Sequence, residues 1–135
     1  MLPLPPRVVV VSGDQWPRAG LRAELRAAGY DAVGARDLFE ALVAYPHDAP
    51  GRGAVALLVV DQDALERERD EGRELLDRLR ARHGDAPTIL LAHAARATPA
   101  GPWATVLRRP VTVGEIVDAV RALVPLSASA RPLDE

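Results

Sequence analysis

The sequence predicts an α/β domain built on a parallel sheet of five strands. Two observations lead to this fold class. Short apolar runs rich in β-branched residues recur along the chain, as expected for strands that are buried on both faces. Between them lie longer stretches in which apolar residues repeat at the spacing of an amphipathic helix. This alternation implies parallel strands joined by right-handed helical crossovers.

Five segments are expected to form the strands. The clearest are 7–12 and 54–60, because nearly every residue in them is apolar. The run 87–92 has the same character, whereas 30–33 is short and weak. The last strand is expected at 103–107, with Trp103 at its start and in the core.

The predicted helices cover 14–28, 36–44, 72–83 and 112–124. Asp14 is expected to cap the first helix and Gly29 to end it. In the second helix we expect Leu38, Leu42 and Val43 to face inward. The last helix opens with Thr112 and has Glu115 three residues on, which is the pattern of a capping box.

Two segments have no clear pattern. Residues 62–71 are highly charged, and we expect a loop or a frayed helix there. Within them, the run 66–71 has charges of mixed sign and is expected to be solvated, although it could also dock a partner. Residues 93–102 include two prolines and a glycine, which disfavour regular structure. We divide the chain into a proline-rich extension (1–6), one domain (7–124) and a mobile tail (125–135).

Composition excludes several classes of function. The chain has 135 residues, enough for one domain with a real core. It has no cysteine, so disulfides, thiol catalysis and zinc–thiolate sites are ruled out. All 17 basic residues are arginine, so chemistry that needs a lysine amine is absent too.

Charge and hydropathy exclude two classes of partner, nucleic acids and membranes. The net charge of −2 gives no electrostatic footprint for binding nucleic acid. No apolar run approaches the ~20 residues of a membrane helix. The start of the chain has no basic segment of the kind that opens a secretory signal. We therefore expect a cytoplasmic protein with no membrane contact.

Four stretches, in this order, resemble the receiver domain of bacterial two-component response regulators over about residues 7–124. The first two look like the third strand with its phosphoacceptor aspartate and the entry to the third helix: Leu58-Val59-Val60-Asp61 and Glu71-Gly72-Arg73-Glu74-Leu75-Leu76. The other two look like the fourth strand and the Lys-Pro junction before the last helix: Pro87-Thr88-Ile89-Leu90-Leu91-Ala92 and Arg109-Pro110. The resemblance implies a flavodoxin-like, doubly wound (βα)5 domain with strand order 2-1-3-4-5.

The sequence departs from the family at the positions that carry its chemistry. Family members hold Mg²⁺ with two adjacent acidic residues after the first strand, and here those positions are Ser12 and Gly13. Asp14 is acidic but lies one residue too far along. The hydroxyl residue that bonds the phosphoryl group is Ala92 here, and the family's lysine is Arg109. Because Mg²⁺ prefers carboxylate oxygens, we expect a site that has lost its acidic metal ligands.

The segment between Ala92 and Arg109 is shorter than in most family members, and it is broken by prolines. We therefore expect the helix between the fourth and fifth strands to be short, irregular or missing. In the family, that helix belongs to the usual partner-binding face. We therefore expect this protein to bind its partner in a different way from other family members.

For Asp61 two interpretations stand side by side. It is either a working phosphoacceptor or an inherited aspartate that pairs with Arg109 or caps the following turn, and we favour the second. Arg109 can contact an anion or form that ion pair, and the two roles are compatible. His93 follows the fourth strand and can act as a ligand, but we expect an ordinary loop histidine.

The sequence therefore predicts a pseudo-receiver: a non-enzymatic, phosphorylation-independent module that binds another protein, without metal or cofactor. The alternative is a receiver phosphorylated on Asp61 by a histidine kinase, and only this alternative needs Mg²⁺. A third possibility is a regulator whose effector domain lies outside this chain, with 125–135 as linker. The expected partner is a histidine kinase or a downstream signalling protein, and the expected state is a monomer or a weak homodimer.

Overall fold

The computed structural model of the protein describes residues 4–45, 54–67 and 70–126. The predicted loop at 47–53 and the end of the predicted tail lie outside the described residues. Of the first helix, the side chains of Gln15 and Trp16 are also not described.

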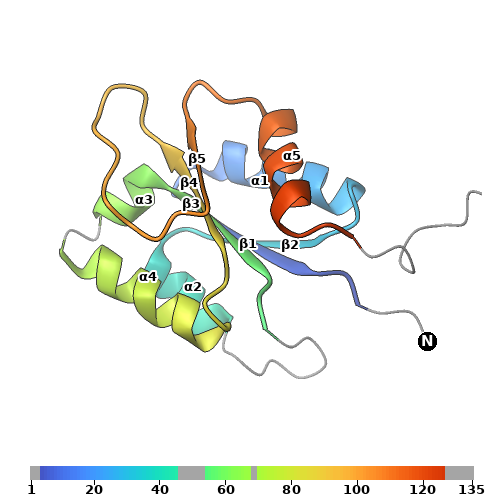
Figure 1. Ribbon diagram of the computed structural model, residues 1–135, viewed down its shortest axis with the longest axis horizontal. Helices are drawn as coiled ribbons and strands as arrows, with labels where there is room; N and C mark the ends of the chain where they lie inside the picture. The colour runs from blue at the N-terminus through green and yellow to red at the C-terminus, as the bar shows by residue number, and fades with distance from the viewer. Residues whose placement is uncertain (1–3, 46–53, 68–69, 127–135) are drawn as a thin grey trace, which may run out of the picture.

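One sheet of five parallel strands forms the centre of the molecule (Figure 1). The strand order is β2-β1-β3-β4-β5, as the family resemblance implies. The strands are β1 (Arg7–Val11), β2 (Asp31–Ala35), β3 (Leu57–Asp61), β4 (Thr88–Ala92) and β5 (Thr105–Arg108). All residues of β3 and β4 are buried, because each is covered on both faces and both edges. This explains why their sequences are continuous apolar runs rather than alternating ones.

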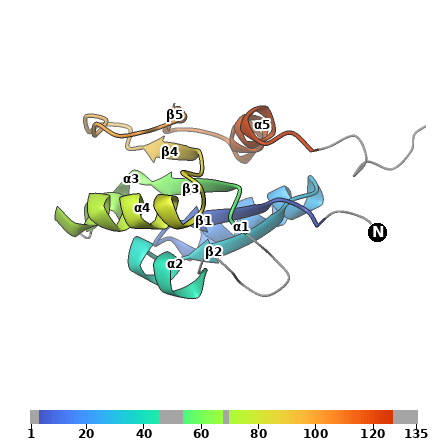
Figure 2. The same ribbon diagram turned by 60° about the horizontal axis from the view of Figure 1, so that its bottom comes forward.

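Helices cover both faces of the sheet (Figure 2). The helices α1 (Gln15–Ala27) and α5 (Val113–Leu123) pack side by side on one face. The helices α2 (Leu38–Ala44), α3 (Gln62–Arg67) and α4 (Asp70–Arg82) cover the other face. Within the described residues, no helix has the length and apolar character needed to cross a membrane.

Each face has its own hydrophobic core, and alternate residues of the same strand point into different cores. In β1, Val8 and Val10 pack under α1 and α5, whereas Val9 and Val11 pack under α2 and α4. Val60 of β3 points into the second core, so the residue after it, Asp61, belongs to the face of α1 and α5. The strand pleat therefore brings Asp61 and Ser12 to the same side of the sheet edge.

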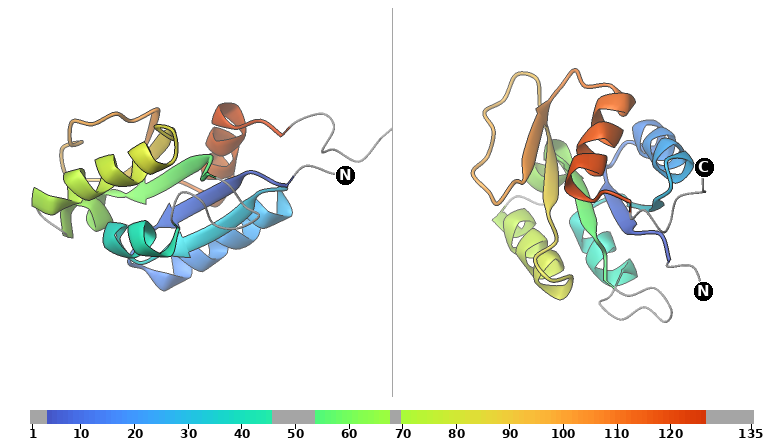
Figure 3. Two further views of the ribbon diagram at one scale, coloured as in Figure 1. Left: turned by 90° about the horizontal axis from the view of Figure 1, so that it is seen from below. Right: turned by 45° about the vertical axis from the view of Figure 1, so that its right-hand side comes forward.

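The crossovers differ from a regular (βα)5 chain. Two helices, α3 and α4, connect β3 to β4, and residues 93–104 connect β4 to β5 without a helix (Figure 3). The missing helix confirms the prediction made from Pro99 and Pro102. The prediction of a loop or frayed helix at 62–71 is corrected, because Gln62–Arg67 is a helix and Ala64 and Leu65 are buried in the core.

Several boundaries and contacts also differ from the sequence prediction. The third strand begins at Leu57, and the second extends to Ala35. Val43 does not face inward: it is 66% exposed, and Ala41 takes the inner position. Trp103 precedes β5 rather than starting it, and its indole packs half-buried against the core while its Nε1 donates to the Pro99 carbonyl (2.8 Å).

The predicted N-terminal helix caps are confirmed for α5 but not for α1. Thr112 and Glu115 form the predicted capping box, with both hydrogen bonds present. Asp14 stands at the N-cap of α1, but its side chain makes no capping hydrogen bond. Gly29 ends α1 with φ +108°, a backbone conformation that residues other than glycine rarely adopt.

Candidate functional site

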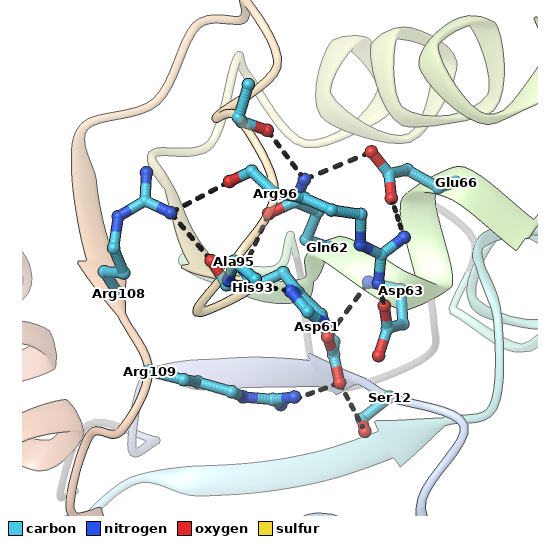
Figure 4. Close-up of polar contacts among 11 residues, drawn as sticks. Ser12, Asp61, Gln62, Asp63, Glu66, His93, Ala95, Arg96, Arg108 and Arg109 are labelled. Carbon is cyan, nitrogen blue, oxygen red and sulfur yellow. Dashed lines mark hydrogen bonds and ion pairs between the residues drawn. The ribbon is translucent and has the colours of Figure 1, made fainter.

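Asp61 lies at the carboxyl end of β3 with only 2% of its surface exposed. Three groups surround its carboxylate (Figure 4). Its Oδ2 accepts hydrogen bonds from Ser12 Oγ (3.2 Å) and Arg109 Nη2 (2.8 Å). Its Oδ1 accepts one from the backbone N–H of Asp63 (3.0 Å). A buried carboxylate held in this way has its charge compensated and its lone pairs engaged.

Arg109 reaches Asp61 from the far side of β4. It follows β5 directly, and its backbone N–H donates to the Ala92 carbonyl (3.0 Å), which ties it to the end of β4. The peptide bond between Arg109 and Pro110 is cis. The Arg109 side chain is 29% exposed, whereas that of Asp61 is 3% exposed, so the ion pair joins a partly exposed cation to a buried acid.

The two positions that hold metal in receiver domains carry no acidic side chain here. Ser12 is buried and donates to Asp61, while its oxygen accepts from the backbone N–H of Asp14 (3.3 Å). Gly13 is covered by Arg67 of α3, because a Cβ at Gly13 would overlap the Arg67 guanidinium. An acidic side chain at position 13 therefore requires Arg67 to move.

These residues do not fit a magnesium ion. Mg²⁺ needs an octahedron of oxygen ligands, usually with more than one carboxylate. Among the described residues Asp61 is the one buried carboxylate, its Oδ2 accepts from the Arg109 guanidinium, and the Arg67 guanidinium lies over Gly13. Asp14 is exposed. Among the described residues, no group of three histidine, cysteine, aspartate or glutamate side chains is placed to bind a metal.

Ala92 ends β4 fully buried and offers no hydroxyl to a phosphoryl group. The structure thus brings Ser12, Asp61, Ala92 and Arg109 to one end of the sheet. What it shows there is a closed polar cluster in which the acid already has a cation.

A second polar cluster, which the sequence did not reveal, holds the segment 93–98 over α3. Gln62 is fully buried, and its Oε1 accepts from the backbone N–H of His93 (2.6 Å). Its Nε2 donates to the Ala97 carbonyl (3.0 Å) and to Glu66 Oε2 (3.1 Å). The one clue in the sequence is a polar residue directly after a fully apolar strand and its aspartate.

Two arginines complete this cluster (Figure 4). Arg96 pairs with Asp63 and Glu66 of α3. Arg108 donates to the carbonyls of His93 (2.7 Å) and Arg96 (3.0 Å), and also to the Thr98 hydroxyl. The expectation that the charges of 66–71 are simply solvated is wrong for Glu66, which pairs with Arg96.

The two histidines in the described residues, His93 and His83, have structural roles. His93 Nδ1 accepts from the backbone N–H of Ala95 (3.0 Å), as suits a loop residue. His83 is buried, where its Nδ1 accepts from the backbone N–H of Val55 (2.9 Å) and its Nε2 lies 2.9 Å from the Tyr45 carbonyl oxygen. It ties the end of α4 to the entry of β3.

Comparison with solved structures finds the same fold in receiver domains. A response regulator receiver domain from Clostridium thermocellum has a TM-score of 0.69 at 14% identity, covering 88% of this chain and 94% of its own. The chemotaxis protein CheY4 of Vibrio cholerae has a TM-score of 0.68 at 18% identity, covering 89% of this chain and 99% of its own.

A response regulator from Burkholderia pseudomallei, described with a phosphorylated aspartic acid, a calcium ion and citrate, has a TM-score of 0.63 at 20% identity. The match covers 89% of this chain and 67% of the Burkholderia protein. No protein-family model matches the sequence, and no curated protein matches it significantly. The chain therefore has the CheY-like receiver fold, and the identities establish the fold alone.

Proposed function

We propose that this protein is a receiver-like signalling module that binds a protein partner without being phosphorylated. A single observation carries the proposal. The carboxylate at the phosphoacceptor position, Asp61, is already ion-paired with Arg109, and the Arg67 guanidinium occupies the space that an acidic side chain at position 13 would need.

The energetics of phosphoryl transfer support this function. The reaction depends on positioning and on neutralising charge at the equatorial oxygens. Loss of one well-placed stabilising group costs on the order of 3 kcal/mol of transition-state energy. Here the acidic pair is replaced by Ser12 and Gly13, and the hydroxyl by Ala92. Two or more such losses make phosphorylation too slow for signalling.

The partner mode follows from the unusual connection between β4 and β5. In place of a helix, the segment 93–98 is held by Gln62, Arg96 and Arg108. A surface fixed in this way presents one shape, as a module that does not switch would. We infer that the partner is a histidine kinase or a downstream signalling protein, that the module itself is not an enzyme, and that it works as a monomer or a weak homodimer.

The alternative function is a working phosphoacceptor. It is favoured by the position of Asp61 at the end of β3 and by a cation 2.8 Å from its Oδ2. An arginine at this position can stabilise a phosphoryl oxygen as well as a carboxylate. In this case a histidine kinase phosphorylates Asp61, and Mg²⁺ is required.

Intact-mass spectrometry after incubation with acetyl phosphate and Mg²⁺ separates the two functions. We expect no phosphoryl adduct on the natural protein. A fourfold variant, Ser12→Asp, Gly13→Asp, Arg67→Ala and Ala92→Ser, restores the family's groups and frees the space over position 13. We expect it to gain an adduct that the further change Asp61→Asn removes. An adduct on the natural protein at Asp61 would support the alternative instead.

The docking role is tested in the source organism by allele replacement. We expect an Asp61→Asn allele to retain the phenotype of the natural allele, because docking does not use the phosphoacceptor. A deletion allele sets the loss-of-function reference. A phenotype of Asp61→Asn equal to that of the deletion, with normal protein abundance, contradicts the proposal.

A further inference from the structure

A cleft of about 500 Å³ lies between α1 and α5 and shares Ser12 and Arg109 with the Asp61 cluster. Its floor is formed by Val10 of β1 and Leu91 of β4, and its walls by Leu21 of α1 and Ile116 of α5. These four side chains are buried and entirely apolar. The volume lies in the range of pockets that hold small organic ligands.

Cations gather at the mouth of this cleft. Arg18 and Arg109 both line it, together with Asp14 and Ser12. Arg18 Nη1 donates to the Ser12 carbonyl oxygen (2.5 Å), which is a neutral acceptor, and the charge of Arg18 also acts on Glu40, whose pKa it helps to lower. Arg109 directs Nη2 to Asp61. Among the described residues each guanidinium is seen to donate one hydrogen bond, while a guanidinium has five N–H groups to offer.

We propose that this cleft binds a small organic carboxylate, with the carboxylate at Arg18 and Arg109 and an apolar body against Val10, Leu21, Leu91 and Ile116. This goes beyond the docking function and does not depend on it. It gives the molecule a small-molecule ligand at the end of the sheet that carries Asp61.

The composition of the cleft selects the ligand class. A bare inorganic anion would leave the apolar floor uncovered and gain nothing from it. A polyanion would meet Asp14 at the mouth and Asp61 behind Arg109. A purely apolar molecule would leave the two guanidinium groups without a new partner. A single carboxylate on an apolar body satisfies both parts, and bidentate pairing suits it to arginine.

The first test is a series of probes on the natural protein, followed by calorimetry and amide NMR. The probes are acetate, hexanoate, octanoate and 4-phenylbutyrate, with 4-phenylbutyramide as the neutral counterpart and inorganic phosphate as the bare anion. We expect affinity to rise about fourfold for each buried methylene. We expect the amide to bind at least tenfold more weakly than its acid, because charge-assisted hydrogen bonds are lost.

Two variants and a matched control locate the site. Arg18→Gln is expected to lower the affinity for 4-phenylbutyrate at least tenfold. Arg22→Gln, one turn along the same helix and outside the cleft lining, is expected to leave it unchanged. Val113→Trp fills the mouth from α5 and is expected to abolish binding; Val113 is 36% exposed, so the core is not disturbed.

Three results would each overturn the proposal. One is the absence of binding by every carboxylate at millimolar concentration. Another is equal affinity for the acid and its amide, which would show an apolar cleft without anion recognition. The third is equal affinity for phosphate and 4-phenylbutyrate, which would show an anion site without use of the floor. None of these results bears on phosphorylation or docking, so the two proposals fail separately.

Discussion

Asp61 is a buried acid that needs a cation, and Arg109 supplies it. Here the ion pair forms in the resting protein, together with hydrogen bonds from Ser12 and the Asp63 backbone. The residues at this end of the sheet thus hold the Asp61 carboxylate in one position.

The change Arg109→Met tests this residue-scale account. It leaves Asp61 buried without its cation, and we expect the free energy of unfolding to fall by about 2 kcal/mol. Urea denaturation at neutral pH measures it. The double variant Asp61→Asn with Arg109→Met removes the uncompensated charge and is expected to recover much of the loss.

The matched control is Arg121→Gln, which breaks an exposed ion pair with Asp118 on α5. It is expected to cost less than about 0.5 kcal/mol. If Arg109→Met is no more costly than Arg121→Gln, the ion pair does not hold the site together.

Glu115 provides a pH-dependent contact outside the site. The backbone N–H of Thr112 donates to its carboxylate (2.8 Å), and this lowers the pKa of Glu115 below its usual value. A depressed pKa means that the stabilisation is present above the unfolded pKa and is lost as the pH falls through the folded pKa. We expect the start of α5 to lose protection from hydrogen exchange as the pH falls through that range.

The variant Glu115→Gln keeps the hydrogen bond and removes the charge. It is expected to abolish this contribution to the pH dependence while leaving α5 capped at neutral pH. An unchanged pH dependence of exchange in Glu115→Gln would contradict the assignment.

Among the elements, the connection between β4 and β5 departs from a regular (βα)5 chain because it contains no helix. It is held by side chains rather than by helical hydrogen bonds, and Gln62 lies at the centre of these contacts. A buried amide that satisfies two backbone groups is costly to remove. We infer that the segment 93–98 is ordered because α3 provides this amide.

The change Gln62→Leu leaves the His93 N–H and the Ala97 carbonyl without a partner. We expect a loss of about 1–3 kcal/mol in unfolding free energy and faster amide exchange across 93–98. Arg73→Ala is the control, because Arg73 donates to the Ala100 carbonyl from an exposed position in α4. Equal exchange in the two variants would show that Gln62 does not hold the segment.

The packing of α3 on α4 depends on a glycine. A Cβ at Gly72 would collide with the Leu65 carbonyl oxygen, which is backbone and cannot move aside cheaply. Gly20 in α1 has nothing within 4 Å of such a Cβ. The same change, glycine to alanine in a helix, is therefore expected to have opposite signs at the two positions.

Gly20→Ala is expected to stabilise the protein by about 0.5–1 kcal/mol through helix propensity. Gly72→Ala is expected to destabilise it despite the same propensity gain. Thermal unfolding of the two variants measures both. Stabilisation by Gly72→Ala would show that α3 and α4 do not approach as closely as the structure has them.

For the whole molecule, the sheet could be predicted because burial on both faces leaves a direct mark on the sequence. The apolar runs of β1, β3 and β4 and the capping box of α5 are local signals of this kind. The break between β4 and β5 was also readable, because Pro99 and Pro102 lie in it. The order of the strands came from the family resemblance.

What could not be predicted depends on contacts between distant segments. The helix α3 has only two apolar residues facing the core, Ala64 and Leu65, so its periodicity is hidden among charges. The contact of Arg67 with Gly13 and that of Gln62 with His93 join different crossovers, and no spacing in the sequence shows them.

The most direct measurement is the backbone amide NMR spectrum of the protein alone, then with Mg²⁺, then with beryllofluoride as a phosphoryl mimic. The account predicts no change at Ser12, Asp61, Ala92 and Arg109, and none along 93–104. Shifts that cluster at these four residues on adding Mg²⁺ and beryllofluoride, and spread into 93–104, would contradict it and show that a phosphorylation switch survives.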